Sequence, residues 1–481
     1  MESEDKRIIY KPLKRRFYIL FSFCIYSFTG GIIWNSWQPL IKSINELYLW
    51  SNTEVNLLNN INAIVVCSLI FPFIILWNKC GIKFAYTTSS CIVLLGCLIR
   101  VFPCKYSIQA IIIQVGNAIS AYGNLMSYVG STAISAIWFP TAERSRSTCT
   151  ALAFSTLGSV MAPIVGTRIV PTFSGNGTNT PENKEKIHLG MQQFMFFHCS
   201  IALTTVLLII IYFPSKPKYM PCKSSEKSLR IDLKSGCIEL AKNKQFWIIF
   251  LLNFITSGFN SGVVSVLPSI IEPLGVTQLE TATLVSVGNL CVFISSIIGG
   301  ILGDKFSYKK IVILSIPPTI VTYVLFGLQS MKIIRHELGV IYAVLLTMLF
   351  VSNIISNISF EMGCEVSFPT GEEVTTAVLG FATNLGIVVI LSVTMITDKN
   401  VTWIPFAYGA AVLLVLPFMF FYKDERKRFN CDFGASPNSC LEVNEDVEAE
   451  RLCSDSSNEE IGNESEDEYK NVDYSSLRFL S

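Results

Sequence analysis

Very few charged side chains interrupt the long apolar stretches of this chain, and those few are the residues that could carry chemistry. Glu361 and Glu365 are four positions apart, so a helix would place both carboxylates on one face. We expect them to pair with Arg144 or Arg146; a shared proton site is the alternative. His198 is the only histidine inside an apolar stretch. Its titration range suits a proton gradient, and a packing role is the alternative.

The elements that must position these residues are membrane-spanning helices. Of 481 residues, 51% are hydrophobic and only 15% are charged, with a mean hydropathy of +0.48. Many apolar runs approach the ~20 residues that a helix needs to cross a bilayer. We therefore predict an all-α membrane protein with twelve transmembrane helices, at roughly 17–41, 55–78, 84–102, 107–136, 146–170, 191–213, 245–270, 280–302, 309–330, 338–361, 373–397 and 402–422.

Chemistry of other kinds is not indicated. No nucleophile–base set and no metal-ligand spacing occurs, so we expect neither an enzyme nor a cofactor, a metal site or a nucleic-acid partner. The cysteines are scattered through the spans, as packing residues are.

Lysine and arginine predict the orientation. They gather before the first span, in the loops on the same side and in the segment 214–244. By the positive-inside rule both termini are cytosolic. The expected domains are a basic N-terminal segment (1–16), an N-terminal six-helix bundle (17–213), a basic cytosolic linker (214–244), a C-terminal six-helix bundle (245–422) and a disordered acidic cytosolic tail (423–481). The sequons at Asn176 and Asn400 then face outward, where glycosylation occurs.

One short segment occurs twice in nearly the same form. FPTAE occupies residues 139–143 and FPTGE occupies residues 368–372, 229 positions apart. The same offset separates Pro39 from Pro268, and a similar one separates Asn78 from Asp304. Several matches at one offset predict two related six-span halves, whose symmetry axis runs along the membrane normal.

The loop GILGDKFSYKK (300–310) resembles the loop signature of the major facilitator superfamily, with Asp304 and Lys305 at its acidic and basic positions. Asn78 replaces the aspartate in the first-half copy, so we expect a weaker gate there, which Asn78→Asp would strengthen. The segments 134–159, 360–372 and WNSWQP (34–39) resemble the feline leukaemia virus subgroup C receptor family, solute carrier family 49. They are most similar to its disrupted-in-renal-carcinoma branch.

This resemblance implies a secondary-active transporter of a small organic nutrient that works by alternating access. The renal-carcinoma branch implies lysosomal, proton-linked transport of pyridoxine or a similar neutral metabolite. The receptor branch implies a choline, ethanolamine or haem carrier, and a receptor or scaffold that does not transport is a further alternative. The expected partners are the solute, protons and the lipid bilayer, and we expect a monomer.

In the superfamily arrangement, spans one, four, seven and ten line a central cavity. Polar and aromatic residues on these and neighbouring spans are the predicted substrate-binding set: Trp34, Asn35, Trp37, Asn124, Tyr128, Asn260, Ser261, Asn357 and Asn384. Serine and asparagine also join transmembrane helices, which is the alternative for each of them.

The resemblance implies that Trp34 is one aromatic wall of a cage for a cationic substrate. The second wall falls on Ser261, and two amide positions fall on Asn124 and Asn384. One aromatic face with amides suits a neutral ring better than a quaternary ammonium. For Trp37, near the outer end, a position in the interfacial belt is the alternative.

The predicted gating and proton-coupling residues are Asn78, Glu143, Arg144, Arg146, His198, Asp304, Lys305, Glu361 and Glu365. A proline and a glutamate at a helix start are also ordinary helix-start chemistry, which explains part of the repeated segment. Tyr10, Tyr469 and Tyr474 begin Y-x-x-Φ stretches of the kind that sorting adaptors read. They are compatible with an endolysosomal or recycling location, with the plasma membrane as the alternative.

Overall fold

The computed structural model of the chain describes residues 13–37, 40–48, 52–102, 106–171, 181–219, 221–222, 233–271, 274, 276, 278–334, 337–396, 401–428 and 431. All of them belong to one compact unit, Met1–Gly434. The predicted glycosylation sites Asn176 and Asn400 and the predicted adaptor-binding residues Tyr10, Tyr469 and Tyr474 lie outside the described residues.

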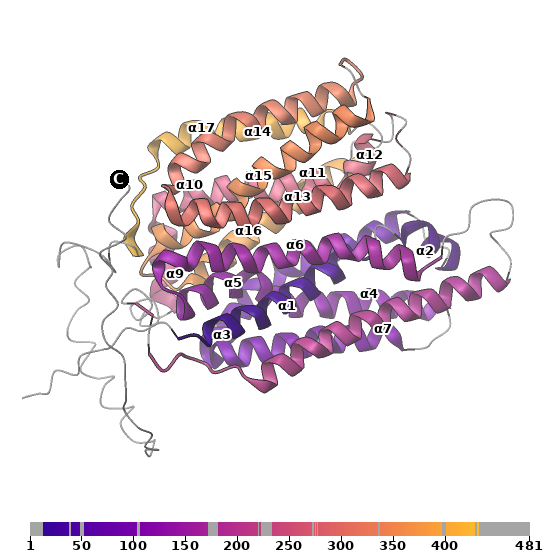
Figure 1. Cartoon of the computed structure of the whole chain (residues 1–481), viewed down its shortest axis with the longest axis horizontal. Helices are drawn as coiled ribbons and strands as arrows, with labels where there is room; N and C mark the ends of the chain where they lie inside the picture. The colour runs from indigo at the N-terminus through magenta and orange to yellow at the C-terminus, as the bar shows by residue number, and fades with distance from the viewer. Residues whose placement is uncertain are drawn as a thin grey trace, which may run out of the picture. The chain divides into compact units, whose positions relative to one another are not determined.

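The apolar runs of the first half form long helices (Figure 1). Their bounds are α1 (Arg16–Asn35), α2 (Ile41–Tyr48), α3 (Asn52–Val101), α4 (Tyr106–Gly123), α5 (Leu125–Trp138), η2 (Thr141–Glu143), α6 (Arg144–Ile169) and α7 (Pro181–Ile211). Those of the second half are α9 (Leu233–Lys242), α10 (Lys244–Asn253), η3 (Phe254–Phe259), α11 (Asn260–Ser265), α12 (Leu267–Ile271), α13 (Gln278–Lys305), α14 (Tyr308–Ser330), α15 (Leu338–Ser367), α16 (Glu372–Ile396) and α17 (Ile404–Phe421).

Within the described residues, ten helices are long and apolar enough to cross a membrane. One of them, α3, contains the second and third expected spans. It is interrupted at Gly81, whose φ of 79° lies in the left-handed region that favours glycine. The fourth expected span is divided at Asn124 into α4 and α5, neither of which is among the ten. These two features reconcile the ten helices with the twelve predicted spans.

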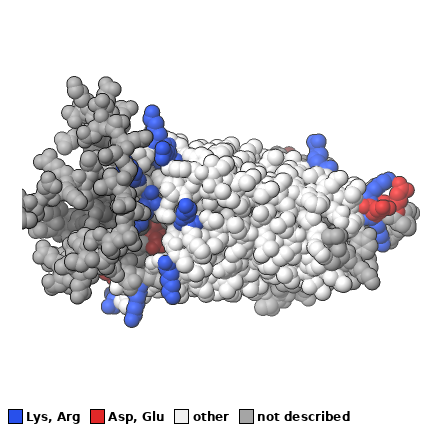
Figure 2. Space-filling view, turned by 90° about the horizontal axis from the view of Figure 1, so that it is seen from below, with Lys and Arg blue, Asp and Glu red and all other residues white. Residues whose placement is uncertain are grey.

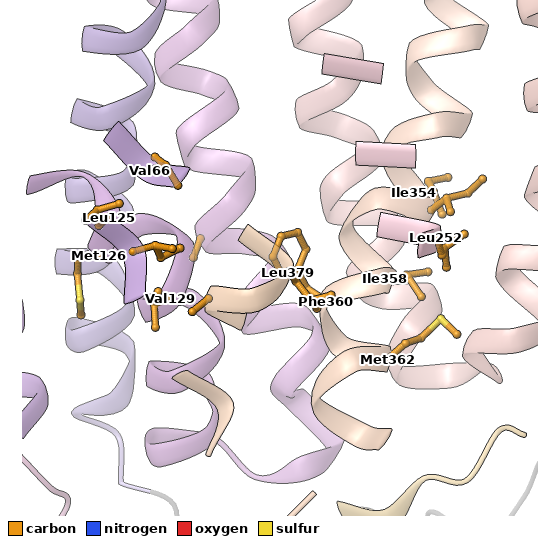
Figure 3. Packing of buried hydrophobic residues seen from close by; sticks show 14 of the residues in the cluster. Val66, Leu125, Met126, Val129, Leu252, Ile354, Ile358, Phe360, Met362 and Leu379 are labelled. Atoms are coloured by element: carbon orange, nitrogen blue, oxygen red, sulfur yellow. The ribbon is translucent and has the colours of Figure 1, made fainter. Parts of the chain in front are cut away.

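The two halves form separate bundles that meet along two seams. Helix α6 packs against α13, and α16 packs against α3 and α5 (Figure 1). At the first seam the backbones approach closely: a Cβ added to Gly300 would lie 2.9 Å from Cys149 Cβ. Figure 3 shows Met126 and neighbouring residues of the first half on one side, Ile358 and its neighbours on the other, and Leu379 between them. The predicted fold of two six-helix bundles is confirmed.

Lysine and arginine gather at one end of the helices, beside a middle surface that is uncharged (Figure 2). We call this the basic end; it holds the starts of α1, α6 and α14, with Arg16, Arg146 and Lys309. The uncharged surface exposes large apolar side chains such as Leu314, which is 79% exposed. Such a surface is suited to contact with lipid chains.

The chain remains ordered beyond the last transmembrane helix. Residues 423–428, which the sequence assigns to the tail, are described and pack on the basic end of the second-half bundle. Arg428 is only 1% exposed. The expected domain boundary at 423 therefore does not coincide with the end of the packed structure.

Candidate transport site and gate

Two of the helices that were predicted to line a cavity are interrupted near the middle of their spans. The fourth span breaks at Asn124, and the seventh passes from α10 through the π-helical segment η3 into α11. Interrupted helices and π-helical turns are frequent at binding sites, because they free polar groups from the regular helical ladder. Both interruptions adjoin predicted site residues, Asn124 in one span and Asn260 and Ser261 in the other.

Trp34 and Asn124 share one region of the first-half interior. A Cβ added to Gly30 of α1 would lie 2.8 Å from Asn124 Oδ1, so the two helices touch there. Trp34 lies four residues after Gly30, on the same face of α1 and one turn away. The indole is half-buried, and Asn124 is 7% exposed. Among the described residues Asn124 Oδ1 has no hydrogen-bond partner, so it is a buried acceptor available to a ligand.

Tyr128 and Asn384 lie where the halves meet. A Cβ added to Gly380 of α16 would lie 3.3 Å from Tyr128 Cβ. Asn384, one turn further along α16, is fully buried and donates Nδ2 to Gly380 O at 2.9 Å. The Tyr128 hydroxyl approaches the Asn384 side chain, whose Oδ1 has no hydrogen-bond partner in the described part of the chain. The junction therefore holds a second buried acceptor.

The segment from η3 to the start of α11 packs against α16, the helix that carries Asn384. A Cβ added to Gly258 in η3 would lie 2.9 Å from Gly386 Cα of α16. Asn260 accepts a hydrogen bond from the Tyr323 hydroxyl, and Ser261 beside it is half-buried. Helix α16 thus links Tyr128 and Asn384 to the segment that carries Asn260 and Ser261.

Two other predicted substrate-binding residues, Asn35 and Asn357, form hydrogen bonds between helices. Asn35 donates Nδ2 to Ser159 Oγ at 2.8 Å, which joins α1 to α6. Asn357 donates Nδ2 to Ser296 Oγ at 2.9 Å, which joins α15 to α13. Hydrogen bonds of this kind hold transmembrane helices together.

Trp37, predicted to bind substrate or to lie in an interfacial belt, is a buried residue of the first-half bundle. Its side chain is 1% exposed and donates Nε1 to Asn117 Oδ1 at 3.4 Å. The guanidinium of Arg100, itself 1% exposed, lies 5.9 Å from the centre of the indole ring. The contact between Trp37 and Arg100 lies at the end of the first-half bundle that is opposite the basic end.

Two hollows in the described surface lie at the basic end of α7. The larger, of about 360 Å³, is lined by Lys83, Thr87 and residues 209–214. The smaller, of about 320 Å³, is lined by Arg15, Tyr18, Ile211 and Tyr212. Neither lies between the bundles, whereas Asn124 and Asn384 are in the packed interior.

A group of four residues joins the two halves at the basic end, and we call it the latch: Ser145, Arg146, Asp304 and Tyr308. Arg146 Nε donates to Asp304 Oδ2 at 2.6 Å, and Ser145 N donates to Asp304 Oδ1 at 3.1 Å. The hydroxyls of Ser145 and Tyr308 are 2.9 Å apart. The Asp304 side chain is 3% exposed, and hydrogen bonds between charged partners are the stronger ones. Of the predicted gating residues, Arg146 and Asp304 are thus brought together.

The other predicted gating residues lie outside the latch. Glu143 pairs with Arg16 of its own half at 2.9 Å. Arg144 is buried and donates to backbone carbonyls of its own half. Asn78 and Lys305 are exposed.

Glu361 and Glu365 pair with Arg428, so the expected pairing with Arg144 or Arg146 is wrong in the described structure. Arg428 Nη2 lies 2.9 Å from Glu361 Oε2, Nε lies 3.2 Å from Glu365 Oε1, and Nη1 lies 3.6 Å from Glu372 Oε1. Burial lowers the pKa of Arg428, but the carboxylates of Glu365 and Glu361 outweigh burial and raise that pKa above its ordinary value.

Arg428 was missed because it follows the last span, in a segment with the composition of a tail. The available signal was the run KDERKR that follows α17, which carries four basic residues against two acidic ones.

His198 lies inside the first-half bundle. It is 1% exposed, its Nε2 is 3.0 Å from Ser36 Oγ, and its ring centre is 4.5 Å from that of Phe194. These contacts support a packing role, which the sequence left open.

With the fold and these contacts established, the sequence comparison decides the family. Residues 19–389 match the profile of the Major Facilitator Superfamily. The chain belongs to that superfamily. It is a multi-pass membrane protein with the fold of a transporter.

Curated relatives confirm the expected resemblance within this superfamily. The chain is 25% identical over 437 residues to "Solute carrier family 49 member 4 homolog" of Xenopus tropicalis, which covers 88% of this chain and 94% of the relative. It is 22% identical over 408 residues to "Choline/ethanolamine transporter FLVCR2" of Homo sapiens, covering 82% and 74% of the two chains.

Solved transporters share the fold at low sequence identity. The fucose transporter FucP in its outward conformation superposes with a TM-score of 0.67 at 16% identity, covering 84% of this chain and 99% of FucP. The proton:xylose symporter XylE superposes with a TM-score of 0.70 at 12% identity, covering 85% and 96%.

Proposed function

We propose that this transporter carries a small, uncharged, hydroxylated ring compound such as pyridoxine, by alternating access and linked to protons. One observation carries the proposal. The half-buried indole of Trp34 lies one turn of α1 beyond Gly30, which packs against Asn124, and the amide oxygens of Asn124 and Asn384 are buried without partners in the described residues. An aromatic face binds a planar ring, and buried acceptors favour a ligand that brings O–H donors.

A choline or ethanolamine carrier is the second candidate, because a relative carries that name. The quaternary ammonium of choline offers no O–H or N–H donor and is held by several aromatic faces, so this argument separates the neutral ring from choline and not from ethanolamine, which carries N–H and O–H donors. In this chain the position of the second face is Ser261, whose hydroxyl cannot serve as one. This difference favours the neutral ring.

For proton linkage, the candidate groups are Glu361, Glu365 and His198. Glu361 and Glu365 already have a counter-charge in Arg428, so they act as part of an ion cluster. His198 stays as the candidate proton site, with Ser36, the ring of Phe194 and the charge of Arg100 beside it.

For orientation, we propose that the basic end faces the cytosol, as the positive-inside rule requires. For location, we propose the lysosomal membrane, which the resemblance to the renal-carcinoma branch implies, with the plasma membrane as the alternative.

The test is uptake by the purified full chain in liposomes. Pyridoxine, choline and ethanolamine are compared with and without an inward-directed proton gradient. We expect saturable pyridoxine uptake that the gradient accelerates. Choline uptake without pyridoxine uptake would replace the proposal by the second candidate, and equal rates with and without the gradient would remove proton linkage.

Two variants locate the site. Trp34→Ala should abolish uptake, whereas Trp247→Ala, which removes a 48% exposed tryptophan at the basic end, should preserve it. Ser261→Tyr supplies the missing second aromatic face and should make choline a better competitor of uptake. If Trp34→Ala transports like the unmodified protein, the site lies elsewhere.

A further inference from the structure

The segment after the last transmembrane helix is fastened across the basic end of the second-half bundle. We call residues 422–428 the strap. At its beginning, Lys423 N donates to Gln245 Oε1 at 3.0 Å, at the start of α10. Further along, the carboxylate of Asp424 accepts a hydrogen bond from Ser307, which caps the start of α14. The strap therefore crosses the ends of several helices instead of leaving the bundle.

The strap contacts the short turn between α13 and α14, and the latch uses the same turn. Arg426 donates to Phe306 O, and its guanidinium lies 4.5 Å from the centre of the Tyr308 ring. On the other side, Tyr308 and Asp304 bind Ser145 and Arg146 of the first half. The turn that presents Asp304 is thus held between the first half and the strap.

Arg428 anchors the far end of the strap. Its side chain is 2% exposed and faces the carboxylates of Glu361, Glu365 and Glu372, which are 2%, 4% and 5% exposed. Its backbone N–H also donates to Glu365 Oε2 at 3.0 Å. Without the guanidinium, the three buried carboxylates would repel each other. Arg428 is therefore the group that lets the end of α15 and the start of α16 lie side by side.

We propose that the strap is part of the basic-end gate, and that Arg428 is a positioning residue that holds the α13–α14 turn in the arrangement in which Asp304 binds Arg146. Release of Arg428 frees the strap, loosens the turn and lets the two halves separate more often at this end. This proposal depends on the movement of the halves and not on which solute is carried.

Cys149 is a natural reporter of that movement. It lies on α6 at the seam with α13, is 1% exposed, and its Cβ would be 2.9 Å from a Cβ on Gly300. A small maleimide can reach it only when the seam opens. The alkylation rate of Cys149 in the full chain, read by mass spectrometry of membranes, therefore measures opening at the basic end without any transported solute.

We expect Arg428→Gln to raise this rate at least about fivefold. The matched control is Lys423→Gln, which removes the same charge from an exposed side chain of the strap and should leave the rate unchanged. An unchanged rate in Arg428→Gln would overturn the proposal, as would an equal increase in Lys423→Gln.

Arg428→Gln leaves buried carboxylates without their counter-charge and could impair folding. The triple variant Arg428→Gln/Glu361→Gln/Glu365→Gln removes that repulsion and still removes the anchor. We expect it to fold, by size-exclusion chromatography, and to show the faster alkylation of Cys149. A folded triple variant in which Cys149 is as protected as in the unmodified protein would also overturn the proposal.

Discussion

The loops FPTAE and FPTGE are nearly identical, and each glutamate is held by an arginine from outside the repeat. Glu143 of the first loop pairs with Arg16, just before the first span, at 2.9 Å. Glu372 of the second loop lies 3.6 Å from Arg428, beyond the last span. The repeat thus preserved an acidic group at the helix start, and the two ends of the chain supplied different partners.

The residues that follow the two glutamates differ in a way that matters more. After the first loop, Arg146 reaches across to Asp304 of the other half. At the matching position after the second loop stands Thr375, which is fully buried with its hydroxyl 2.7 Å from that of Ser367. The match to Asp304 is Asn78, which is exposed. The latch therefore exists once, although the sequence that builds it was duplicated.

The largest expected effect is on the latch itself. Asp304→Asn removes the charge that Arg146 binds, and hydrogen bonds to charged groups contribute about 1.5–3 kcal/mol. Because 1.4 kcal/mol is tenfold in an equilibrium, we expect alkylation of Cys149 to accelerate about tenfold. The exchanged pair Asp304→Arg/Arg146→Asp should recover part of the protection. No acceleration in the single variant would mean that the halves are held elsewhere.

A smaller effect is expected at the first loop. The Glu143 side chain is 38% exposed, so its pair with Arg16 is screened and is worth about 1 kcal/mol or less. Arg16→Gln should therefore lower the melting temperature of the purified protein much less than Arg428→Gln, whose partners are buried. If the two variants have the same melting temperature, the ion pairs of the two loops do not differ in their contribution to stability.

The smallest effect concerns Asn78. From the sequence, Asn78→Asp should strengthen a gate, but the structure places Thr375 where the partner arginine would be needed. We expect the variant to leave the alkylation rate of Cys149 unchanged. Its free energy of unfolding should change by no more than about 0.5 kcal/mol, as for most exposed substitutions. A clear gain of protection would show that another cation reaches this loop.

Hydropathy, charge and the repeat were sufficient to predict the helices and their grouping into halves. A membrane-spanning helix can be identified from its own residues alone, because the thickness and the apolar interior of the bilayer set its length and composition. The same local information could not predict that Asn35 and Asn357 bind neighbouring helices, whereas Asn124 and Asn384 keep unpartnered oxygens. All four are asparagines in apolar surroundings, and only packing distinguishes them.

The sequence by itself determined the membrane-spanning class, the two-half architecture and the residues from which a latch could be built. Tertiary structure alone decided which charges meet, because Coulomb attraction acts over distances that the fold sets and not over separation in the sequence. Asp304 thus meets Arg146, 158 positions away. Glu361 is bound by Arg428, from a segment whose composition resembles an unstructured tail.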